Sequence, residues 1–234
     1  MDSEAFRLEE RDIEELSPDH LVDLAGAENL PIHAEFFPIP GEGLLELLAV
    51  ALTAAALASG TSTRDADALA WAIESLGIHL ETYSGWDAAF VRMTVPTERL
   101  DEAAALFADV VRRPTFPEDE ITRLREQQLA GILQRRKQPG TLAGDTAART
   151  IFTPDVPYSR PLVGTTSSVR ALGRDDVTAY YAARYAPMGA ALVVVGDIDR
   201  AAARDLAERC FGDWTGPDVV RRDYPATGAI DHFR

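Results

Sequence analysis

Apolar and polar residues alternate with a period of two in several short segments of the chain, and this period is typical of half-buried β-strands. Gly85-Trp86-Asp87 separates two of these segments and predicts an antiparallel hairpin. A later run, Ala191–Asp199, is largely apolar and predicts an interior strand that ends at a tight turn. The alternating segments that we expect to form strands are His20–Leu24, Ile32–Pro38, Ile78–Ser84 and Ala88–Val95.

The remaining apolar residues recur every three or four positions, and this spacing predicts amphipathic helices. Thr61 or Thr63 can cap the second of these helices at its start, and Gly77 can end it in the left-handed conformation. The Pro-, Gly- and Ser-rich segment 153–168 predicts a connection that either crosses the surface or lines a cleft. The expected helices are Leu44–Gly60, Ser62–Leu76, Thr97–Arg112, Pro117–Gln138, Thr141–Ile151, Asp175–Tyr185 and Arg200–Cys210.

The size and charge of the chain narrow its class. A chain of 234 residues can bury a substantial core as one domain. The formal net charge of −15 argues against nucleic-acid binding, which needs clustered Lys and Arg, and the short basic run Arg135–Lys137 is expected to be a favourable contact with a helix dipole. The first residues lack the pattern of a secretory signal, and no apolar run is long enough for a confident membrane span. We therefore expect a cytoplasmic protein that binds neither nucleic acid nor membrane.

Few residues of the chain suit catalysis. Cys210 is the only cysteine, so an internal disulfide is excluded, and its place at the end of an amphipathic helix predicts a structural thiol. Gly196 follows the apolar strand, but the dinucleotide fingerprint and the Walker lysine are both absent. The histidines show no metal-ligand spacing, although a hydrolase that uses Asp19-His20 with a distant serine stays open as a third alternative. The four histidines are His20, His33, His79 and His232.

The helix expected at Leu44–Gly60 carries the most informative pattern. A Gly-containing turn precedes it, and Gly60-Thr61 ends it. This setting resembles the zinc helix of the insulinase or pitrilysin (M16) family of metallopeptidases, whose inverzincin motif H-x-x-E-H lies just ahead of a Gly-Thr pair. By this resemblance, the first metal histidine corresponds to Ala51, the catalytic glutamate to Ala54 and the second histidine to Ala55.

Alanine at all three positions removes the chemistry of the motif. A catalytic zinc ion needs about three protein ligands and must lower the pKa of its water to about 7, whereas a methyl group neither coordinates a metal nor accepts a proton. The resemblance places the third ligand within Leu129–Gln134, which contains no carboxylate. Nearby Glu126 either matches an acid that supports the ligands or faces solvent. We therefore expect no catalytic, cofactor-binding or metal-binding residue in this chain, and zinc only in a catalytic partner.

The resemblance extends over nearly the whole chain and implies a fold. The implied fold is an α+β half-molecule, with a mixed, largely antiparallel sheet and helices packed on one face. Residues 1–17 would form an N-terminal extension or first strand, 18–216 the insulinase-type domain, and 217–234 the start of a linker or of a missing second half. The similar stretches are LPIHAEFFPIPGEG, Gly60-Thr61 through LGIHLETYSGWD, RRPTFPEDEITRLREQQL, and YSRPLVGT continuing to YYAARYAPMGAALVVVGDID and FGDW.

The resemblance also implies a function. Family members usually join two halves, and in some bacterial members a subunit that lacks H-x-x-E-H pairs with one that carries it. Our leading hypothesis is a non-catalytic subunit or domain that forms part of a peptide-holding chamber with such a partner. The alternative is a stand-alone peptide-binding or chaperone-like module of a peptide maturation pathway, in which an extended peptide joins an exposed sheet edge. Arg184 and Tyr185 match the helix before the apolar strand, where we expect them to pack.

Overall fold

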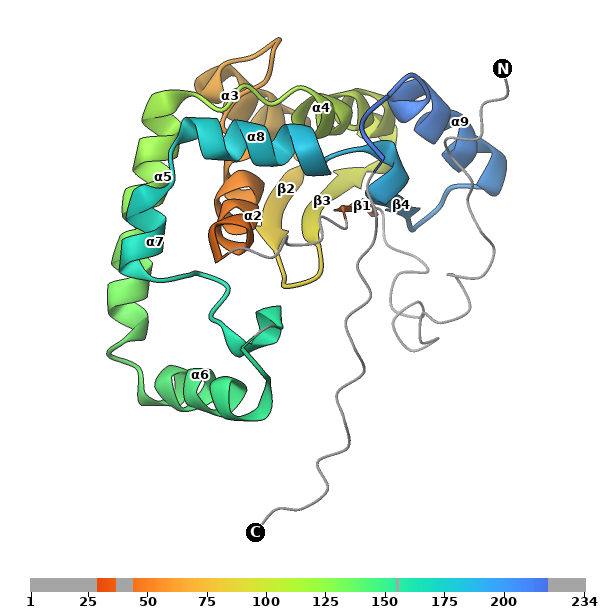
Figure 1. The fold of residues 1–234 in the computed structure, drawn as a ribbon. Helices are drawn as coiled ribbons and strands as arrows, with labels where there is room; N and C mark the ends of the chain where they lie inside the picture. The colour runs from red at the N-terminus through yellow and green to blue at the C-terminus, as the bar shows by residue number, and fades with distance from the viewer. Residues whose placement is uncertain (1–28, 37–43, 155, 219–234) are drawn as a thin grey trace.

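The fold, in a computed structural model, is an antiparallel sheet with helices around it (Figure 1). The structure describes residues 29–36, 44–154 and 156–218, and it describes side chains from residue 49 onward. The sheet has the strand order β2-β3-β1-β4, and every pairing among its strands is antiparallel. The strands are β1 (Asn29–Phe36), β2 (His79–Ser84), β3 (Ala89–Pro96) and β4 (Ala190–Val194).

Strand β3 shows why the sheet has one covered face. Its residues alternate between fully buried and partly exposed, as the sequence period predicts. The predicted hairpin is confirmed, because β2 and β3 pair in register from His79 opposite Thr94 to Ser84 opposite Ala89. Strand β4 pairs only with β1 within the described residues, so there it forms an edge and is half-buried rather than interior. The strand expected at His20–Leu24 lies outside the described residues.

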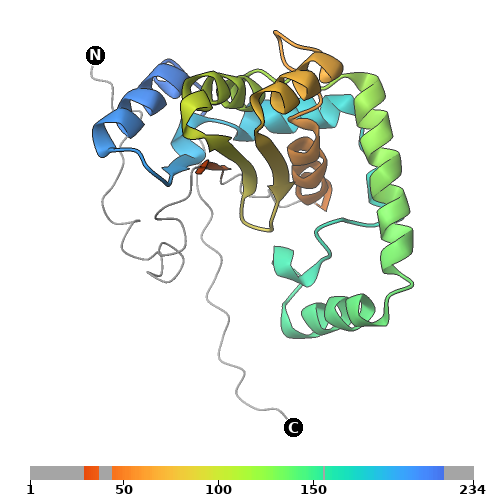
Figure 2. The same cartoon turned by 180° about the vertical axis from the view of Figure 1, so that it is seen from behind.

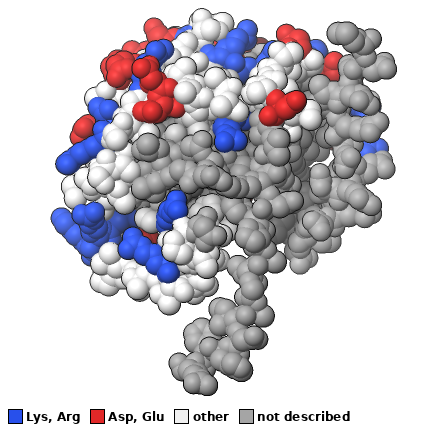
Figure 3. Space-filling view, in the orientation of Figure 1, with Lys and Arg blue, Asp and Glu red and all other residues white. Residues whose placement is uncertain are grey.

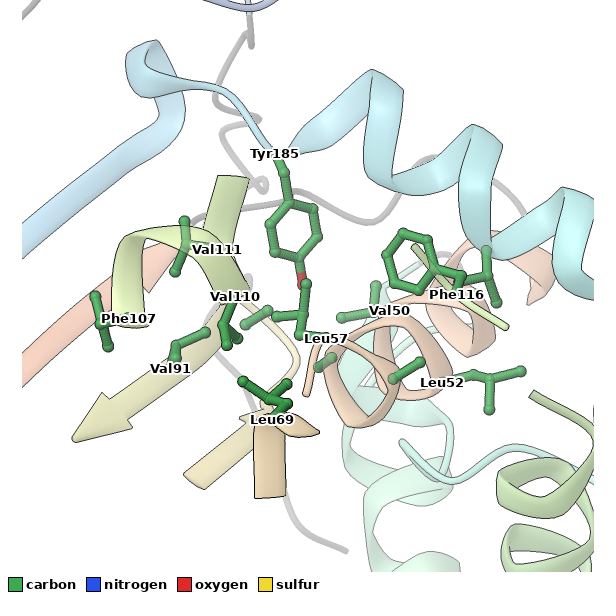
Figure 4. Close-up of a cluster of buried hydrophobic side chains, with 14 of the residues drawn as sticks. Val50, Leu52, Leu57, Leu69, Val91, Phe107, Val110, Val111, Phe116 and Tyr185 are labelled. Carbon is green, nitrogen blue, oxygen red and sulfur yellow. The ribbon is translucent and has the colours of Figure 1, made fainter. Parts of the chain in front are cut away.

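Helices α2 and α4 contact the covered face of the sheet, and α8 packs on α2. Side chains from α2, α3, β3 and α4 converge there with Tyr185, which confirms its predicted packing (Figure 4). The fold is α+β, as predicted. The α-helices are α2 (Leu44–Ala56), α3 (Ala66–Leu76), α4 (Leu100–Arg112), α5 (Glu118–Arg135), α6 (Pro139–Ile151), α7 (Thr166–Ala171), α8 (Arg174–Arg184) and α9 (Arg200–Phe211), joined by the short 3-10 helices η3 (Thr97–Arg99), η4 (Pro157–Ser159) and η5 (Pro187–Gly189).

The start of α3 differs from the prediction. The helix begins at Ala66, and the side chain of Asp65 caps it by accepting a hydrogen bond from the Ala68 amide at 2.8 Å. Neither Thr61 nor Thr63 caps this helix, because both hydroxyls donate to a distant carboxylate instead. Gly77 ends α3 in the left-handed conformation, with φ at 66°, as the sequence predicts.

Helices α5 and α6 form an arm that extends away from the sheet (Figures 1 and 2). No side chain of α6 is buried, and its main contact is with η4. Within the segment 153–168, which we expected to be irregular, the structure contains η4 and the start of α7, where Thr165 and Ser168 form a capping box. Among the described residues, no helix has both the length and the apolar character to span a bilayer.

Candidate functional site

The candidate site lies on α2, at the positions that the resemblance assigned to a zinc motif. Ala51, Ala54 and Ala55 stand three and four residues apart, so they lie near one another on the helix surface. Ala54 is fully buried, Ala51 is half-buried and Ala55 is exposed. The three positions therefore extend from the core of the molecule to its surface, and the side chain at each of them is a methyl group.

Helix α5 lies against α2, at the place where the family would supply its third ligand. Within Leu129–Gln134, the two buried side chains are Leu129 and Ile132, and both are hydrocarbon. Glu126, one turn earlier, is exposed to solvent. The contact between α2 and α5 is therefore hydrophobic packing, and it offers no carboxylate to a metal.

These residues do not fit a zinc ion. Zinc sites in proteins use thiolate, imidazole or carboxylate ligands in sets of three or four. The described part of the chain contains no cluster of three or more His, Cys, Asp or Glu side chains that could hold a metal. His79, the histidine whose side chain the structure describes, is exposed on β2 and lies 3.1 Å from the Glu81 carboxylate. No step of zinc chemistry can be derived from this donor set.

The turn that follows α2 is fixed to α4 by a buried carboxylate. Thr61 Oγ1 donates a hydrogen bond of 2.6 Å to Asp109 Oδ2, and Thr63 donates to the same oxygen. On the other side, Arg113 Nε lies 2.7 Å from Asp109 Oδ1. The Asp109 side chain is 2% exposed, so its carboxylate has lost most of its hydration on folding. The hydrogen bonds and the ion pair must compensate for that loss.

The surroundings of Asp109 determine its ionisation. Burial alone raises the pKa of this carboxyl group, but hydrogen bonds from Thr61 and Thr63 and the positive charge of Arg113 outweigh burial. The net result is a pKa below the usual 3.8, so the group stays ionised near neutral pH. Sequence analysis missed this carboxylate, although an acid flanked by Leu106–Ala108 and Val110–Val111 on an apolar helix was a visible signal.

The lone cysteine lies apart from this site. Cys210 is half-buried in the last turn of α9, and Arg112 Nη1 donates 2.6 Å to its backbone carbonyl. Burial raises the pKa of the Cys210 thiol, although Arg209 and Arg112 partly oppose that shift. A raised thiol pKa disfavours the reactive thiolate, in agreement with the structural role that the sequence predicts.

Within the part of the chain that the structure describes, strand β2 is an edge of the sheet and lies beside α2. It pairs with β3 on one side only within the described sheet, and it also contacts α2. On the sheet face turned away from the helices, Tyr83 stacks on Phe90 with ring centroids 4.9 Å apart. An unpaired strand edge presents backbone donors and acceptors that an extended chain can pair with.

The tip of the β2–β3 hairpin is tied to the segment around η4. Trp86 Nε1 donates 3.1 Å to the Arg160 carbonyl, and the Tyr158 hydroxyl donates to Asp87. The Trp86 and Tyr158 rings lie 6.3 Å apart. The segment therefore returns from the arm to the hairpin tip, which the sequence could not show. We call this set of contacts the hairpin latch.

Together, these features define a peptidase-like module without ligands at the positions expected of a metal site. Two family models match the chain: Insulinase (Peptidase family M16) over residues 52–164, and Peptidase M16 inactive domain over residues 171–232. Together they cover most of the sequence. The chain belongs to the M16 family, as a homologue of its peptidases.

Individual relatives agree with this assignment. An uncharacterized zinc protease of Rickettsia bellii is 28% identical over 67% of this chain and 38% of its own length. Subunit 1 of the mitochondrial cytochrome b-c1 complex of Bos taurus is 26% identical over 67% of this chain and 32% of its own length. The crystal structure of a peptidase M16 inactive domain from Pseudomonas fluorescens superposes with a TM-score of 0.76 and 25% identity, covering 86% of this chain and 50% of that one. The chain thus spans about a third of the length of these two curated relatives.

Proposed function

We propose that this chain is a non-catalytic part of an M16-type peptidase and that it forms one wall of a peptide-holding chamber. The partner in this proposal carries H-x-x-E-H, its zinc ion and the catalytic glutamate. The observation that carries the proposal is the set of methyl groups at Ala51, Ala54 and Ala55 within an otherwise peptidase-like fold. A chain that keeps the scaffold but lacks these ligands suits peptide binding rather than hydrolysis.

The packing of α5 supports the same proposal. If only the motif on α2 had been lost, a carboxylate facing α2 from α5 would remain as a trace of the site. The buried residues of the corresponding segment are instead Leu129 and Ile132, which lie in the hydrophobic core. Both helices that the resemblance expects to supply metal ligands therefore present hydrocarbon side chains at those positions.

The open edge of β2 supports a role in peptide binding. In β-strand addition, main-chain hydrogen bonds supply affinity, and pockets for alternate side chains supply selectivity. Strand β2 lies next to α2, so a peptide added there would run alongside the helix that bears the zinc motif in the active members. Because β2 is part of this chain, a peptide could add to it without a second subunit. The edge therefore also favours our second candidate function, a peptide-binding or chaperone-like module that needs no partner.

A reconstitution experiment tests the main proposal. The chain, an H-x-x-E-H-bearing M16 subunit and their mixture are each assayed for cleavage of the same fluorogenic peptides in the presence of zinc. We expect no cleavage by the chain alone and a marked increase when the two proteins are mixed. Hydrolysis by this chain alone, abolished by a chelator, contradicts the proposal.

A titration separates the two candidate functions. Labelled extended peptides are added to the chain alone and to its mixture with the active subunit, and anisotropy is recorded. Binding that saturates only in the mixture supports the chamber. Saturable binding of comparable affinity by the chain alone, with no change on adding the subunit, assigns the chain to the stand-alone module instead.

A further inference from the structure

The end of the arm carries positive charge in a chain that is strongly acidic overall. Between residues 127 and 154, the sequence has four basic side chains and one acid, whereas the whole chain has a formal charge of −15. Figure 3 shows acidic and basic side chains interspersed over the upper part of this face and mostly basic ones at the lower left, where the arm lies. The basic side chains are Arg135, Arg136, Lys137 and Arg149.

The single acid of this region accounts for only one of these charges. Arg135 Nη2 lies 3.3 Å from Asp145 Oδ1, and this pair joins the end of α5 to α6. Arg136, Lys137 and Arg149 are exposed, and none of them forms an ion pair with another described residue. We call these three residues the basic corner: Arg136 and Lys137 lie at the junction of α5 and α6, and Arg149 lies in the last turn of α6, about 15 Å further along that helix. The ion pair between Arg135 and Asp145 joins α5 to α6 beside these residues, and their three charged groups stay exposed to solvent.

The arm holds the basic corner away from the acidic body. Helix α5 has 18 residues and so spans about 27 Å, because an α-helix rises 1.5 Å per residue. That length is about three times the Debye length at physiological salt, so acids near the start of α5 are screened from its end. The corner therefore presents a local positive field despite the negative net charge of the chain.

The apolar residues near the basic corner indicate which kind of anionic partner fits it, a membrane surface or a protein. Leu142 and Ile151 are both exposed on α6, but they stand nine residues apart and so project from opposite sides of the helix. A helix that lies on a bilayer needs its large apolar side chains along one face, whereas the two large exposed apolar side chains of α6 do not share a face. Arginine, in contrast, pairs with carboxylates through two parallel hydrogen bonds. Isolated apolar side chains beside it can contact a protein partner, whose surface mixes polar and apolar groups.

We propose that the basic corner is a docking surface for a carboxylate-rich segment of a partner polypeptide. This inference stands apart from the proposed function, because the corner lies on the arm and not on the β2 edge (Figure 1). Leu133 and Leu142, which are 53% and 46% exposed, flank the corner and would contact apolar residues of the same segment.

Binding of a labelled oligoglutamate peptide of about ten residues to the full chain tests this proposal, measured by anisotropy between about 50 and 300 mM salt. We expect saturable binding that weakens as salt rises. The variant Arg136→Gln, Lys137→Gln, Arg149→Gln should lose at least about tenfold in affinity, since each lost charge-assisted contact weakens binding. The control Arg99→Gln, Arg170→Gln, Arg204→Gln removes the same charge from exposed sites elsewhere and should stay within about twofold of the parent.

Two results would overturn the proposal. The first is peptide binding that the corner variant does not weaken more than the control variant. The second is absence of saturable peptide binding by the parent chain, and sedimentation on vesicles of anionic phospholipid would then assign the corner to a membrane. A salt-sensitive dimer in analytical ultracentrifugation would in that case assign the corner to a second copy of this chain instead.

Discussion

Asp109 shows how a single side chain fixes the geometry next to the candidate site. It accepts hydrogen bonds from the turn after α2 and belongs to α4, so it joins two elements that are distant in sequence. Arg113 and Arg64 add positive charge on its outer side, at 2.7 Å and 3.3 Å. One buried charge therefore helps to hold the Gly60-Thr61 turn, together with the backbone hydrogen bonds from Ser62 N–H to the Arg113 carbonyl and from Thr115 N–H to the Gly60 carbonyl.

Replacing this carboxylate should destabilise the protein. Asp109→Ala leaves the buried Thr61 hydroxyl without its acceptor, so we expect a loss of about 3 kcal/mol in the free energy of unfolding. Urea denaturation measures this loss. Asp101→Ala is the matched control, because Asp101 is 83% exposed and pairs with Arg209 at the surface, where such pairs contribute less than about 1 kcal/mol. Equal effects of the two substitutions would contradict the account.

The same carboxylate should make stability depend on acid pH. The folded-state pKa of Asp109 is lowered, so its contribution is present above the unfolded-state pKa and is lost as pH falls through the folded value. We expect the stability difference between the parent and Asp109→Asn to shrink as pH falls below about 4. Denaturation curves of both proteins across this range measure it. A difference that stays constant or grows toward acid pH would show that the sign is wrong.

The positions of the candidate site come from the family resemblance, which assigns Ala51, Ala54 and Ala55 by a fixed interval before Gly60-Thr61. That assignment stays a prediction, and the structure adds that all three residues lie on α2. The bond between Thr61 and Asp109 spans 48 residues, and no local pattern encodes such a contact. This is also why the threonines were mistaken for helix caps.

At the scale of elements, the hairpin latch controls where the arm returns to the body. Trp86→Ala removes the hydrogen bond to the Arg160 carbonyl and the ring contact with Tyr158. We expect faster hydrogen exchange at the amides of Ser159 and Arg160, with a change of less than about 1 kcal/mol in global stability, since local opening is separable from unfolding. Mass spectrometry of peptides from residues 150–165 measures the exchange.

Trp71→Ala is the control for this prediction. Trp71 is 71% exposed on α3, so its loss removes an indole of the same size from an open surface. It should leave exchange around η4 unchanged. If Trp86→Ala likewise leaves that exchange unchanged, or unfolds the whole protein, the latch does not act as described.

Two glycines with positive φ should differ in their tolerance of a side chain. Gly60 has φ at 135°, and a Cβ there would stand 3.2 Å from Thr115 Oγ1, whereas Gly77 has φ at 66° with open space around it. We expect Gly77→Ala to cost about 1 kcal/mol and Gly60→Ala clearly more, because only the former occupies a region that other residues enter. Thermal and urea denaturation of the two variants provide the comparison. A larger loss for Gly77→Ala would contradict this ranking.

Secondary structure followed from the sequence wherever a periodic pattern was long. The β2–β3 hairpin and the helices α4, α5 and α8 lie close to their expected bounds, because each buries a regular set of apolar positions. Helix α7 has only six residues and was missed, since its capping box lies in a segment rich in turn formers. Short elements of this kind depend on tertiary contacts, such as that between α7 and α5.

At the scale of the whole molecule, an M16 fold carries alanine at the three positions of α2 that the resemblance assigns to the zinc motif. Helix α2 contacts both the sheet and α5, and the buried side chains of α5 within Leu129–Gln134 are hydrocarbon. The order of strands was beyond sequence reasoning, because β1 pairs with β3 and β4, whose sequences lie far from it along the chain. Resemblance to the family implied a mixed, largely antiparallel sheet with helices on one face, but not the order of its strands.

Zinc content tests the central claim most directly. The purified full chain is incubated with excess zinc, dialysed and analysed for metal by mass spectrometry, with an active H-x-x-E-H-bearing M16 peptidase treated in parallel. The account predicts much less than one zinc ion per chain here and about one per chain in the active peptidase, since a catalytic site needs about three ligands. One tightly held zinc ion per chain of this protein, retained through dialysis, would contradict it.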